Sequence, residues 1–429
     1  MKKGKSKLRN VLERFAGATF FITLIYLILI IKLTSGYHQM PGYGWILTFY
    51  SIAIGIYILS RFLLAYFHKP VSFDPYYEPT VSVVVPAKNE GENIAETIRC
   101  FFNSNYPKEK MEIIAINDGS DDNTYAEMLR AQKEGQAQGI NVEVINWKVN
   151  KGKREGMAEG VKRAKNKIIV FVDSDSFVEK DCIRHLVKYF SNPKIGTVSG
   201  HTNVYNKNTN ILTKMQSLRY YVSFKIYKAA ESIFGVVTYC PGCCSAYRKA
   251  YLDPVLEEWR TQKFLGSVCT LGYDRSLTNF IIKKYDAINT AEAKAETVVP
   301  DNFQTYMRQQ QRWKKSWVRE TFIAAKFMWK KNPIAAISFY TYLFLAFAAP
   351  FVFFHAVIYY PLAISGQTPL PYLFGLFIML VLHGVYYRNQ TKRTDWLTSS
   401  IAFWVYTVLL IWQLPWALLT MKDSRLRTR

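Results

Sequence analysis

The chain has 429 residues, a formal net charge of +23 and a hydrophobic content of 50%. This length is enough for two domains, and the charge suits nucleic acid, an anionic membrane face or an anionic substrate. Long apolar stretches at both ends make the membrane face the simplest partner for the charge, so we expect no nucleic acid partner.

Two apolar stretches lie near the start of the chain. Basic residues precede Phe15–Leu33, which has the length of a membrane span. A signal peptide has a shorter core and a small-residue cleavage site, so an uncleaved helix is favoured. The second candidate span is Trp45–Phe67, with Arg61 toward its end and Lys69 beyond it. Because basic flanks favour the cytoplasm, residues 1–68 are predicted to form a transmembrane hairpin.

Residues 69–302 have the pattern of a soluble α/β domain. Apolar, β-branched runs of strand length alternate there with helical patterns, without hairpin signals between them. These runs are Thr80–Pro86, Met111–Ile116, Asn141–Trp147 and Ile168–Val172. This alternation predicts a mostly parallel sheet.

The last of these runs ends at Asp173-Ser174-Asp175. Open α/β sheets bind ligands beyond the carboxyl ends of their strands. Two carboxylates one residue apart at this place suit a hard divalent cation that keeps free positions for substrate phosphates. By itself the triplet is equally compatible with a strand-end turn capped by Asp and Ser.

Three other segments fit the same sugar-nucleotide pocket. Pro86 to Glu90 lie at the end of the first run, and Asp118 lies in the turn N-D-G-S, where a carboxylate can accept hydrogen bonds from a base or a ribose. Lys153 lies in N-K-G-K-R, whose glycine allows close backbone approach and whose cations suit a diphosphate. Each segment alone is also compatible with an ordinary turn or a solvated basic loop.

Six cysteines lie in the middle region, and their spacing does not suggest a disulfide framework, so we interpret them as reduced and cytosolic. They are Cys100, Cys182, Cys240, Cys243, Cys244 and Cys269. Cys240 and Cys243 form a C-x-x-C, but no second Cys or His pair completes a zinc site.

Residues 303–332 combine Trp and Phe at near-helical spacing with many basic residues, which predicts amphipathic helices in the membrane interface. Residues 333–429 contain three apolar stretches and are predicted to be a C-terminal transmembrane region. The stretches are roughly Ile334–Tyr360, Tyr372–Tyr387 and Leu397–Thr420.

The loop Arg388–Arg393 and the tail Lys422–Arg429 are both basic, so both favour the cytoplasm. Three full crossings after a cytosolic domain would put the tail outside. One stretch is therefore expected to be re-entrant, interfacial or a short hairpin, with breaks at Ala348–Pro350 or Pro415. The number of crossings stays open.

The ordered motifs V-V-V-P-A-K-N-E, I-N-D-G-S-D-D-N-T, N-K-G-K-R and V-D-S-D resemble those of the inverting family-2 glycosyltransferases with a GT-A fold. The later motifs P-G-C-C-S-A-Y-R, C-T-L-G-Y-D-R-S-L-T and Q-Q-Q-R-W resemble the processive branch, which makes hyaluronan, chitin oligomers, poly-N-acetylglucosamine and cellulose. The resemblance covers about Val81–Thr321. It implies an α/β fold in which a GT-A-type, mostly parallel sheet forms a cytosolic domain between transmembrane helices of a multi-pass cell-membrane protein.

The resemblance also implies roles for the donor-site residues. Pro86 and Glu90 would contribute to substrate binding, Asp118 would hold the uracil end of UDP, and Lys153 would lie near the diphosphate. The D-x-D residues would bind the nucleotide and a metal, Mg²⁺ or Mn²⁺. These residues are Asp173 and, most directly, Asp175.

On the acceptor side, Asp274 matches the general base, which takes the proton of the acceptor hydroxyl during an inverting transfer. Cys269 matches a cysteine on the priming loop that senses the acceptor. The motif at the mouth of the acceptor channel corresponds to Gln309, Arg312 and Trp313. Without the resemblance, Asp274 could be a helix cap and Trp313 a core aromatic.

Two departures from the family pattern stand out. Tyr273 replaces the middle acid of G-D-D, which leaves Asp274 as a single carboxylate. The C-terminal W-G-T-R of many relatives is here Leu426-Arg-Thr-Arg429, so contact between this tail and the nucleotide is open.

The leading functional hypothesis is a processive synthase that polymerises UDP-GlcNAc and UDP-GlcA into hyaluronan, with the growing polysaccharide and membrane lipids as partners. Three alternatives stay open. They are a polymer made from UDP-GlcNAc alone, a non-processive transferase acting on a polyprenyl phosphate, and a degenerate subunit without activity. The sugars joined, the direction of growth and the oligomeric state are not determined by the sequence.

Overall fold

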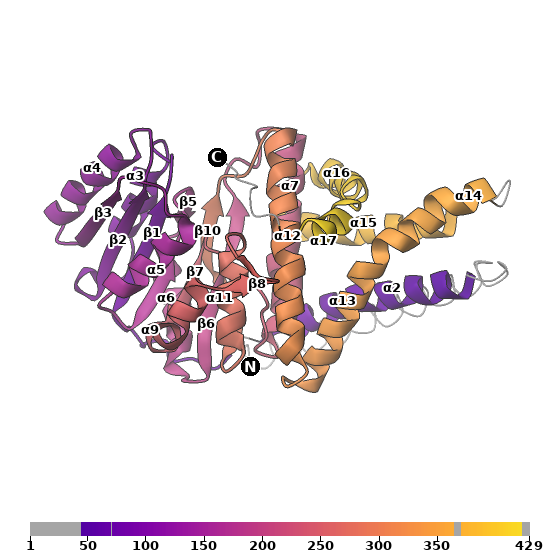
Figure 1. Ribbon diagram of the computed structural model, residues 1–429, viewed down its shortest axis with the longest axis horizontal. Helices are drawn as coiled ribbons and strands as arrows, with labels where there is room; N and C mark the ends of the chain where they lie inside the picture. Colours follow the sequence, from indigo (N-terminus) through magenta and orange to yellow (C-terminus); the bar gives the residue numbers. More distant parts are fainter. Residues whose placement is uncertain (1–43, 70, 364–369, 423–429) are drawn as a thin grey trace, which may run out of the picture.

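A central sheet of eight strands organises the middle of the chain in the computed structural model, which describes residues 44–69, 71–363 and 370–422 (Figure 1). Its strands run in the order β3-β2-β1-β4-β7-β6-β10-β5. Their bounds are β1 Val81–Ala87, β2 Met111–Asp118, β3 Asn141–Trp147, β4 Ile168–Phe171, β5 Ser176–Val178, β6 Ile195–Val204, β7 Ser245–Arg248 and β10 Asp286–Thr297. A separate small hairpin consists of β8 Lys263–Phe264 and β9 Ser267–Val268.

The sheet is mostly parallel, as the sequence predicts. β1 pairs in parallel with β2 and β4, β2 with β3, and β6 with β10. β7 runs antiparallel between β4 and β6, and β5 runs antiparallel to β10. Because parallel neighbours end on the same side, Asp118 at the end of β2 and Asp173 just after β4 come to one edge of the sheet.

Helices cover both faces of the sheet, and alternate β1 residues supply the two cores because successive side chains of a strand point to opposite faces. Val83 and Val85 pack with α3, α4 and α6. Val84 packs with α5, α10 and α11. The bounds are α3 Ile94–Phe102, α4 Thr124–Ala137, α5 Lys153–Arg163, α6 Cys182–Val187, α10 Leu256–Arg260 and α11 Tyr273–Ile282.

The long helix α12, Phe303–Met328, stands between the sheet domain and the apolar helices (Figure 1). It packs against α11 on the domain side and against α13 and α17 on the other. The remaining elements are α2 Gly44–Phe67, α7 Ile211–Val222, a π-helical turn Ser223–Lys228, α8 Ala229–Ser232, α9 Lys249–Leu252, α13 Pro333–Phe354, a second π-helical turn His355–Tyr359, α14 Tyr360–Ala363, α15 Leu370–Thr391, α16 Trp396–Leu409 and α17 Gln413–Leu419, with short 3-10 turns at Lys108–Lys110, Lys188–Ser191 and Asp253–Val255.

Three segments of the described chain are helical, long and apolar enough to cross a membrane: Thr48–Phe67, Pro333–Tyr359 and Trp396–Leu419. Within the last of them, the helix breaks between α16 and α17, just before Pro415. Pro350 lies inside α13 without ending it. The predicted first span Phe15–Leu33 and the tail Leu426–Arg429 lie outside the described residues.

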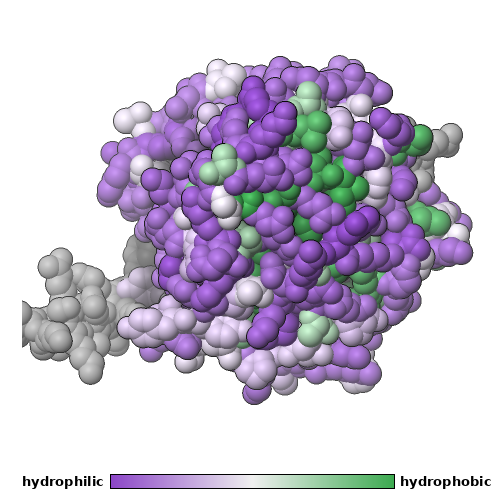
Figure 2. Space-filling model, turned by 90° about the vertical axis from the view of Figure 1, so that its left-hand side faces the viewer, coloured by the Kyte–Doolittle hydropathy of each residue, from purple (hydrophilic) through white to green (hydrophobic). Residues whose placement is uncertain are grey.

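The face of the sheet domain that is farthest from the apolar helices is mostly hydrophilic, with a smaller hydrophobic area near its middle (Figure 2). Large apolar side chains on the opposite part of the chain are exposed, among them Phe344, Phe351 and Leu409. This division fits a water-facing domain joined to helices whose outer faces need an apolar environment.

Candidate active site

One large cavity, about 1650 Å³ in volume, connects the carboxyl edge of the sheet with α12 and the apolar helices. Ten of the site residues that the sequence predicts line it: Pro86, Glu90, Asp118, Lys153, Asp173, Asp175, Asp274, Gln309, Arg312 and Trp313. They come from loops that are far apart in the chain, so the fold gathers them in one place.

Asp118 ends β2 and is held by the following basic loop. Its carboxylate accepts hydrogen bonds from the backbone N–H groups of Lys151 (2.6 Å) and Gly152 (3.0 Å). Burial raises the pKa of Asp118, and these two N–H groups act in the opposite direction. The contact ties the N-K-G-K-R loop to the strand end, and Lys153 begins α5 directly after it.

Asp173 is held between a lysine and a cysteine. Lys153 Nζ forms a short ion pair with Asp173 Oδ1, and Cys243 Sγ lies 3.3 Å from Asp173 Oδ2. Burial opposes the charge on Lys153, but Asp173 and Asp274 outweigh it and raise the lysine pKa. A positive charge is therefore retained in the cavity beside the D-x-D motif, where it can interact with phosphate.

Asp175 directly precedes β5, and its Oδ1 is 3.4 Å from Thr297 Oγ1 on β10. Its backbone carbonyl accepts a hydrogen bond from Val298 N (3.2 Å). These contacts orient Asp175 from the strand that pairs with β5. Carboxylate oxygens are the ligands that Mg²⁺ and Mn²⁺ prefer, so Asp175 and Asp173 fit a hard divalent cation.

Asp274, the second residue of α11, has an oxygen that is free to receive a proton. Its Oδ1 is buried and lacks a hydrogen-bond partner in the described part of the chain. Burial raises the pKa of Asp274 to about 7, and the charge of Asp173 acts in the same direction. A carboxyl with a pKa near neutrality is suited to general base catalysis.

The carboxylates of Asp173 and Asp274 both lie close to Gly242. A Cβ at this position would lie 2.5 Å from Asp173 Oδ1 and 3.3 Å from Asp274 Oδ1. Only a glycine lets this loop lie so close to both carboxylates. The segment after β4 and the start of α11 thus place their carboxylates next to each other in the cavity.

The Q-Q-Q-R-W segment lies on the wall of the cavity that faces the apolar helices. Trp313 is half-buried, with its ring centroid 6.5 Å from that of Tyr220 and 5.7 Å from Arg219 Cζ. Arg219 Nη1 donates to Gln310 Oε1 (2.6 Å). An indole held in this way offers a face on which a sugar ring can stack.

Comparison with known proteins identifies the family. A family model described as Glycosyl transferase family 2 matches residues 82–256. A hyaluronan synthase of Streptococcus pyogenes serotype M3 is 33% identical over 291 residues, which are 67% of this chain and 68% of that protein. The chain belongs to the family-2 glycosyltransferases. This finding confirms the predicted family and the predicted transferase activity.

Other similarities of this glycosyltransferase agree with the family. An N-acetylglucosaminyltransferase of Azorhizobium caulinodans is 32% identical over 263 residues, which are 61% of this chain and 65% of that protein. A solved mannosyltransferase of Pyrobaculum calidifontis, in complex with GDP-Man and Mn²⁺, has a TM-score of 0.57 at 21% identity and covers 84% of this chain and 99% of its own. This likeness confirms the expected GT-A-type fold.

Cys269 differs from the other predicted site residues of the glycosyltransferase. It is buried and lies beside a small separate hollow, together with Leu271 and Lys315, rather than on the wall of the large cavity. Its backbone N–H donates to the carbonyl of Gln262 (3.0 Å). Cys269 is therefore not among the residues that line the large cavity, although the next residues, Thr270 and Leu271, are.

Several cavity residues of the glycosyltransferase were not singled out from the sequence. Cys243 belongs to a C-x-x-C and to the motif P-G-C-C-S-A-Y-R, but no site role was predicted for it, although its sulfur contacts Asp173. Lys228 lies in a π-helical turn, and such turns are frequent at functional sites. Its Nζ donates to Ser199 Oγ (3.1 Å), and burial lowers its pKa to about 8. No sequence pattern marks this turn.

Proposed function

We propose that this glycosyltransferase is a multi-pass cell-membrane synthase that polymerises UDP-GlcNAc and UDP-GlcA into hyaluronan in a processive manner. In this proposal residues 69–302 form the cytosolic catalytic domain and residues 303–332 lie at the membrane interface. Residues 1–68 and 333–429 contribute the membrane helices. The relatives named hyaluronan synthase and N-acetylglucosaminyltransferase support the donor class.

The continuity of the cavity is the observation that carries the proposal. The same cavity is lined by Asp118 and Asp274 on the sheet side and by Trp313 on α12. It extends to apolar helices, where its walls include Ala346 and Pro350 of α13 and Phe403, Tyr406 and Thr407 of α16. A polymer that grows at Asp274 therefore has a path toward the membrane helices.

The donor half of the cavity suits a sugar nucleotide with a divalent metal. Asp118 would accept hydrogen bonds from the base, and Lys153 would contact the diphosphate. Asp173 and Asp175 would hold Mg²⁺ or Mn²⁺ together with substrate phosphates, an arrangement in which one or two carboxylates are enough. The metal supplies positive charge that stabilises the departing diphosphate. The mannosyltransferase with GDP-Man and Mn²⁺ supports a metal of this class.

Asp274 would act as the base of an inverting transfer. Its unpartnered Oδ1 takes the proton of the acceptor hydroxyl as the hydroxyl oxygen attacks C1 of the donor sugar. The bond from C1 to the UDP oxygen breaks on the opposite side. Trp313 would hold the ring of the acceptor sugar during this step, while Arg312 and Gln309 line the same wall.

Basic side chains on the acceptor side favour hyaluronan over a neutral polymer. Five of them line the cavity near α7, α11 and α12: Arg219, Lys228, Arg275, Arg312 and Lys314. A wall of this charge attracts a chain that carries a carboxylate on every second sugar. A polymer of UDP-GlcNAc alone is the second candidate, supported by the N-acetylglucosaminyltransferase relative.

Incubation with defined donors tests the proposal. The full chain in detergent receives UDP-GlcNAc, UDP-GlcA or both, with Mg²⁺ or Mn²⁺, and the product is sized on a gel and digested with hyaluronidase or chitinase. Hyaluronidase-sensitive polymer from the mixture alone is the expected result. Chitinase-sensitive polymer from UDP-GlcNAc alone supports the second candidate, and a single lipid-linked sugar contradicts both. Absence of UDP release by wild-type chain supports an inactive subunit.

Trp313→Ala is expected to shorten the polymer and to raise the half-saturating acceptor concentration about fivefold, because a sugar-stacking surface worth about 1 kcal/mol is removed. Product length distribution and UDP release at varied oligosaccharide acceptor measure the effect. The affinity for UDP stays as in wild type.

Trp329→Ala is the control, since Trp329 is exposed at the end of the same helix and does not line the cavity. Trp313→Phe keeps an aromatic face and is expected to recover most of the length. Equal product lengths for Trp313→Ala and Trp329→Ala would rule out the stacking role.

A further inference from the structure

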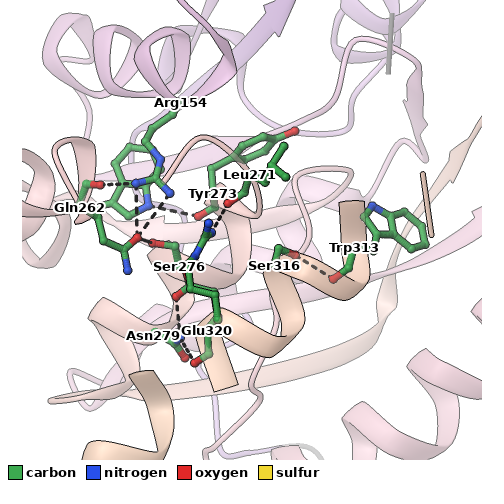
Figure 3. A network of polar contacts seen from close by, with 11 residues as sticks. Arg154, Gln262, Leu271, Tyr273, Ser276, Asn279, Trp313, Ser316 and Glu320 are labelled. Atoms are coloured by element: carbon green, nitrogen blue, oxygen red, sulfur yellow. Dashed lines mark hydrogen bonds and ion pairs between the residues drawn. The ribbon is translucent and has the colours of Figure 1, made fainter. Parts of the chain in front are cut away.

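Helices α11 and α12, which carry Asp274 and Trp313, are joined by buried polar contacts behind the cavity (Figure 3). Asn279 Nδ2 on α11 donates to Glu320 O (3.0 Å) and to Glu320 Oε2 (3.1 Å) on α12. Arg319 donates from Nε to Glu320 Oε1 (2.8 Å) and from Nη2 to the carbonyl of Leu271. The end of α11 and the loop before it are thus both attached to one turn of α12.

The same two helices touch near the reacting groups. A Cβ on Gly272 would lie 2.3 Å from Ser316 Cβ, so the backbone that caps α11 lies directly against α12. Gly272 also has a φ of +66°, which favours glycine. Ser316 Oγ donates to the carbonyl of Trp313 (3.0 Å). Trp313 is therefore connected to the start of α11, next to Asp274, through contacts of Ser316 with Gly272.

The residues of this connection are too buried to be a surface ion pair. Glu320 is 0% exposed and Asn279 is 3% exposed. Buried charges are tolerated when they are paired and hydrogen-bonded, and each oxygen of Glu320 has a donor here. Such a satisfied network has one geometry, and it holds its two helices in one relative position.

The opposite flank of α11 is held separately. Arg154 on α5 donates to the carbonyl of Trp259 (2.6 Å), and Trp259 Nε1 donates to the carbonyl of Tyr273 (3.2 Å). Gln262 accepts from Ser276 Oγ of α11 and contacts Arg154 (Figure 3). Because α5 begins at Lys153, these hydrogen bonds connect α11, which carries Asp274, to the donor side of the cavity. The contacts with α12 relate α11 to the acceptor wall.

We propose that Asn279, Arg319 and Glu320 are positioning residues that set the separation between Asp274 and Trp313. They touch neither donor nor acceptor and act through the two helices that they join. The inference rests on the proposed function, because it assigns the acceptor sugar to Trp313. Loss of the connection should slow transfer while donor binding is preserved.

Asn279→Ala in the full chain tests this proposal. It removes both hydrogen bonds between the helices and leaves the Arg319–Glu320 pair intact. We expect the kcat of transfer to fall about 10- to 100-fold, since a displacement near 1 Å has effects of this size. We expect the KM for the UDP-sugar and the Kd for UDP, measured by calorimetry, to stay within twofold of wild type.

Asn166→Ala is a matched control. Asn166 Nδ2 also donates to a carbonyl and a carboxylate, Val81 O (2.8 Å) and Glu112 Oε1 (3.2 Å), away from the cavity. It is expected to leave kcat unchanged. Gly272→Ala disturbs the other α11–α12 contact and is expected to show the same fall in kcat with unchanged UDP affinity.

The proposal is overturned if the kcat values of Asn279→Ala and Gly272→Ala both lie within threefold of the kcat of Asn166→Ala. A parallel loss of UDP affinity also overturns it, since it would indicate a general structural role. If Asn279→Ala does not fold, the kcat and the UDP affinity of Gly272→Ala test the proposal without it. UDP release reports transfer to any acceptor, so the comparison of kcat values does not depend on the identity of the product. Failure of the wild-type chain to make hyaluronan would therefore contradict only the proposed function.

Discussion

Asp274→Asn is expected to lower the rate of sugar transfer by about 10³-fold, because the amide keeps the shape of the side chain but cannot accept the proton of the acceptor hydroxyl. The buried, unpartnered Oδ1 and the pKa of about 7 are the features that suit Asp274 to this role. UDP release and polymer yield measure the loss. Calorimetric affinity for UDP is expected to stay near the wild-type value, since Asp118 and Lys153 are unchanged.

Asp286→Asn is the matched control for this substitution. Burial also raises the pKa of Asp286, but this residue begins β10 and does not line the cavity. Its variant should transfer sugar at the wild-type rate. An Asp274→Asn chain with more than a third of wild-type activity is incompatible with a base at this position, and a loss of UDP affinity would assign Asp274 to donor binding instead.

Asp175→Asn is expected to raise the Mg²⁺ or Mn²⁺ concentration needed for half-maximal activity by at least about 10-fold, because one carboxylate ligand is lost. Chelation of the metal by EDTA is expected to stop UDP release by wild type, and either cation should restore it. The physical reason is that the departing diphosphate carries charge that Lys153 alone does not neutralise. Metal titrations of UDP release measure both effects.

Asp181→Asn provides the comparison. Asp181 lies six residues further along the chain, at the exposed start of α6, where it accepts a hydrogen bond from Asn105 (2.9 Å). Its metal requirement is expected to equal that of wild type. Full activity of wild type in EDTA, or an unchanged metal requirement of Asp175→Asn, would remove the metal from the proposed mechanism.

Local sequence patterns predict the first half of the sheet well. The runs that become β1, β2, β3 and β4 match the observed strands within two residues at each end. β1, β2 and β4 are buried on both faces, which favours largely apolar runs, whereas β3 lies at the edge of the sheet and alternates polar and apolar residues. The approximate position of α12 was predicted from the near-helical spacing of Trp and Phe among basic residues. The ordered motifs identified the family, which the comparisons confirm.

The second half of the sheet was not predictable in this way. β7 has only four residues and inserts antiparallel between β4 and β6, which are distant from it in sequence. Its pairing depends on contacts between remote segments rather than on any local period. The predicted apolar stretch Tyr372–Tyr387 lies within the helix α15.

The sequence by itself located the buried strands, the polar residues at their ends and the motifs, since buried strands and close backbone approaches restrict local composition. Tertiary structure decided which of those residues share a space. It brings Asp173 and Asp274 together beside Gly242, places Cys269 outside the lining of the large cavity, and joins Asn279 to Glu320 by a hydrogen bond. Such relations depend on packing between segments far apart in the chain, where single side-chain contacts leave no periodic pattern to read.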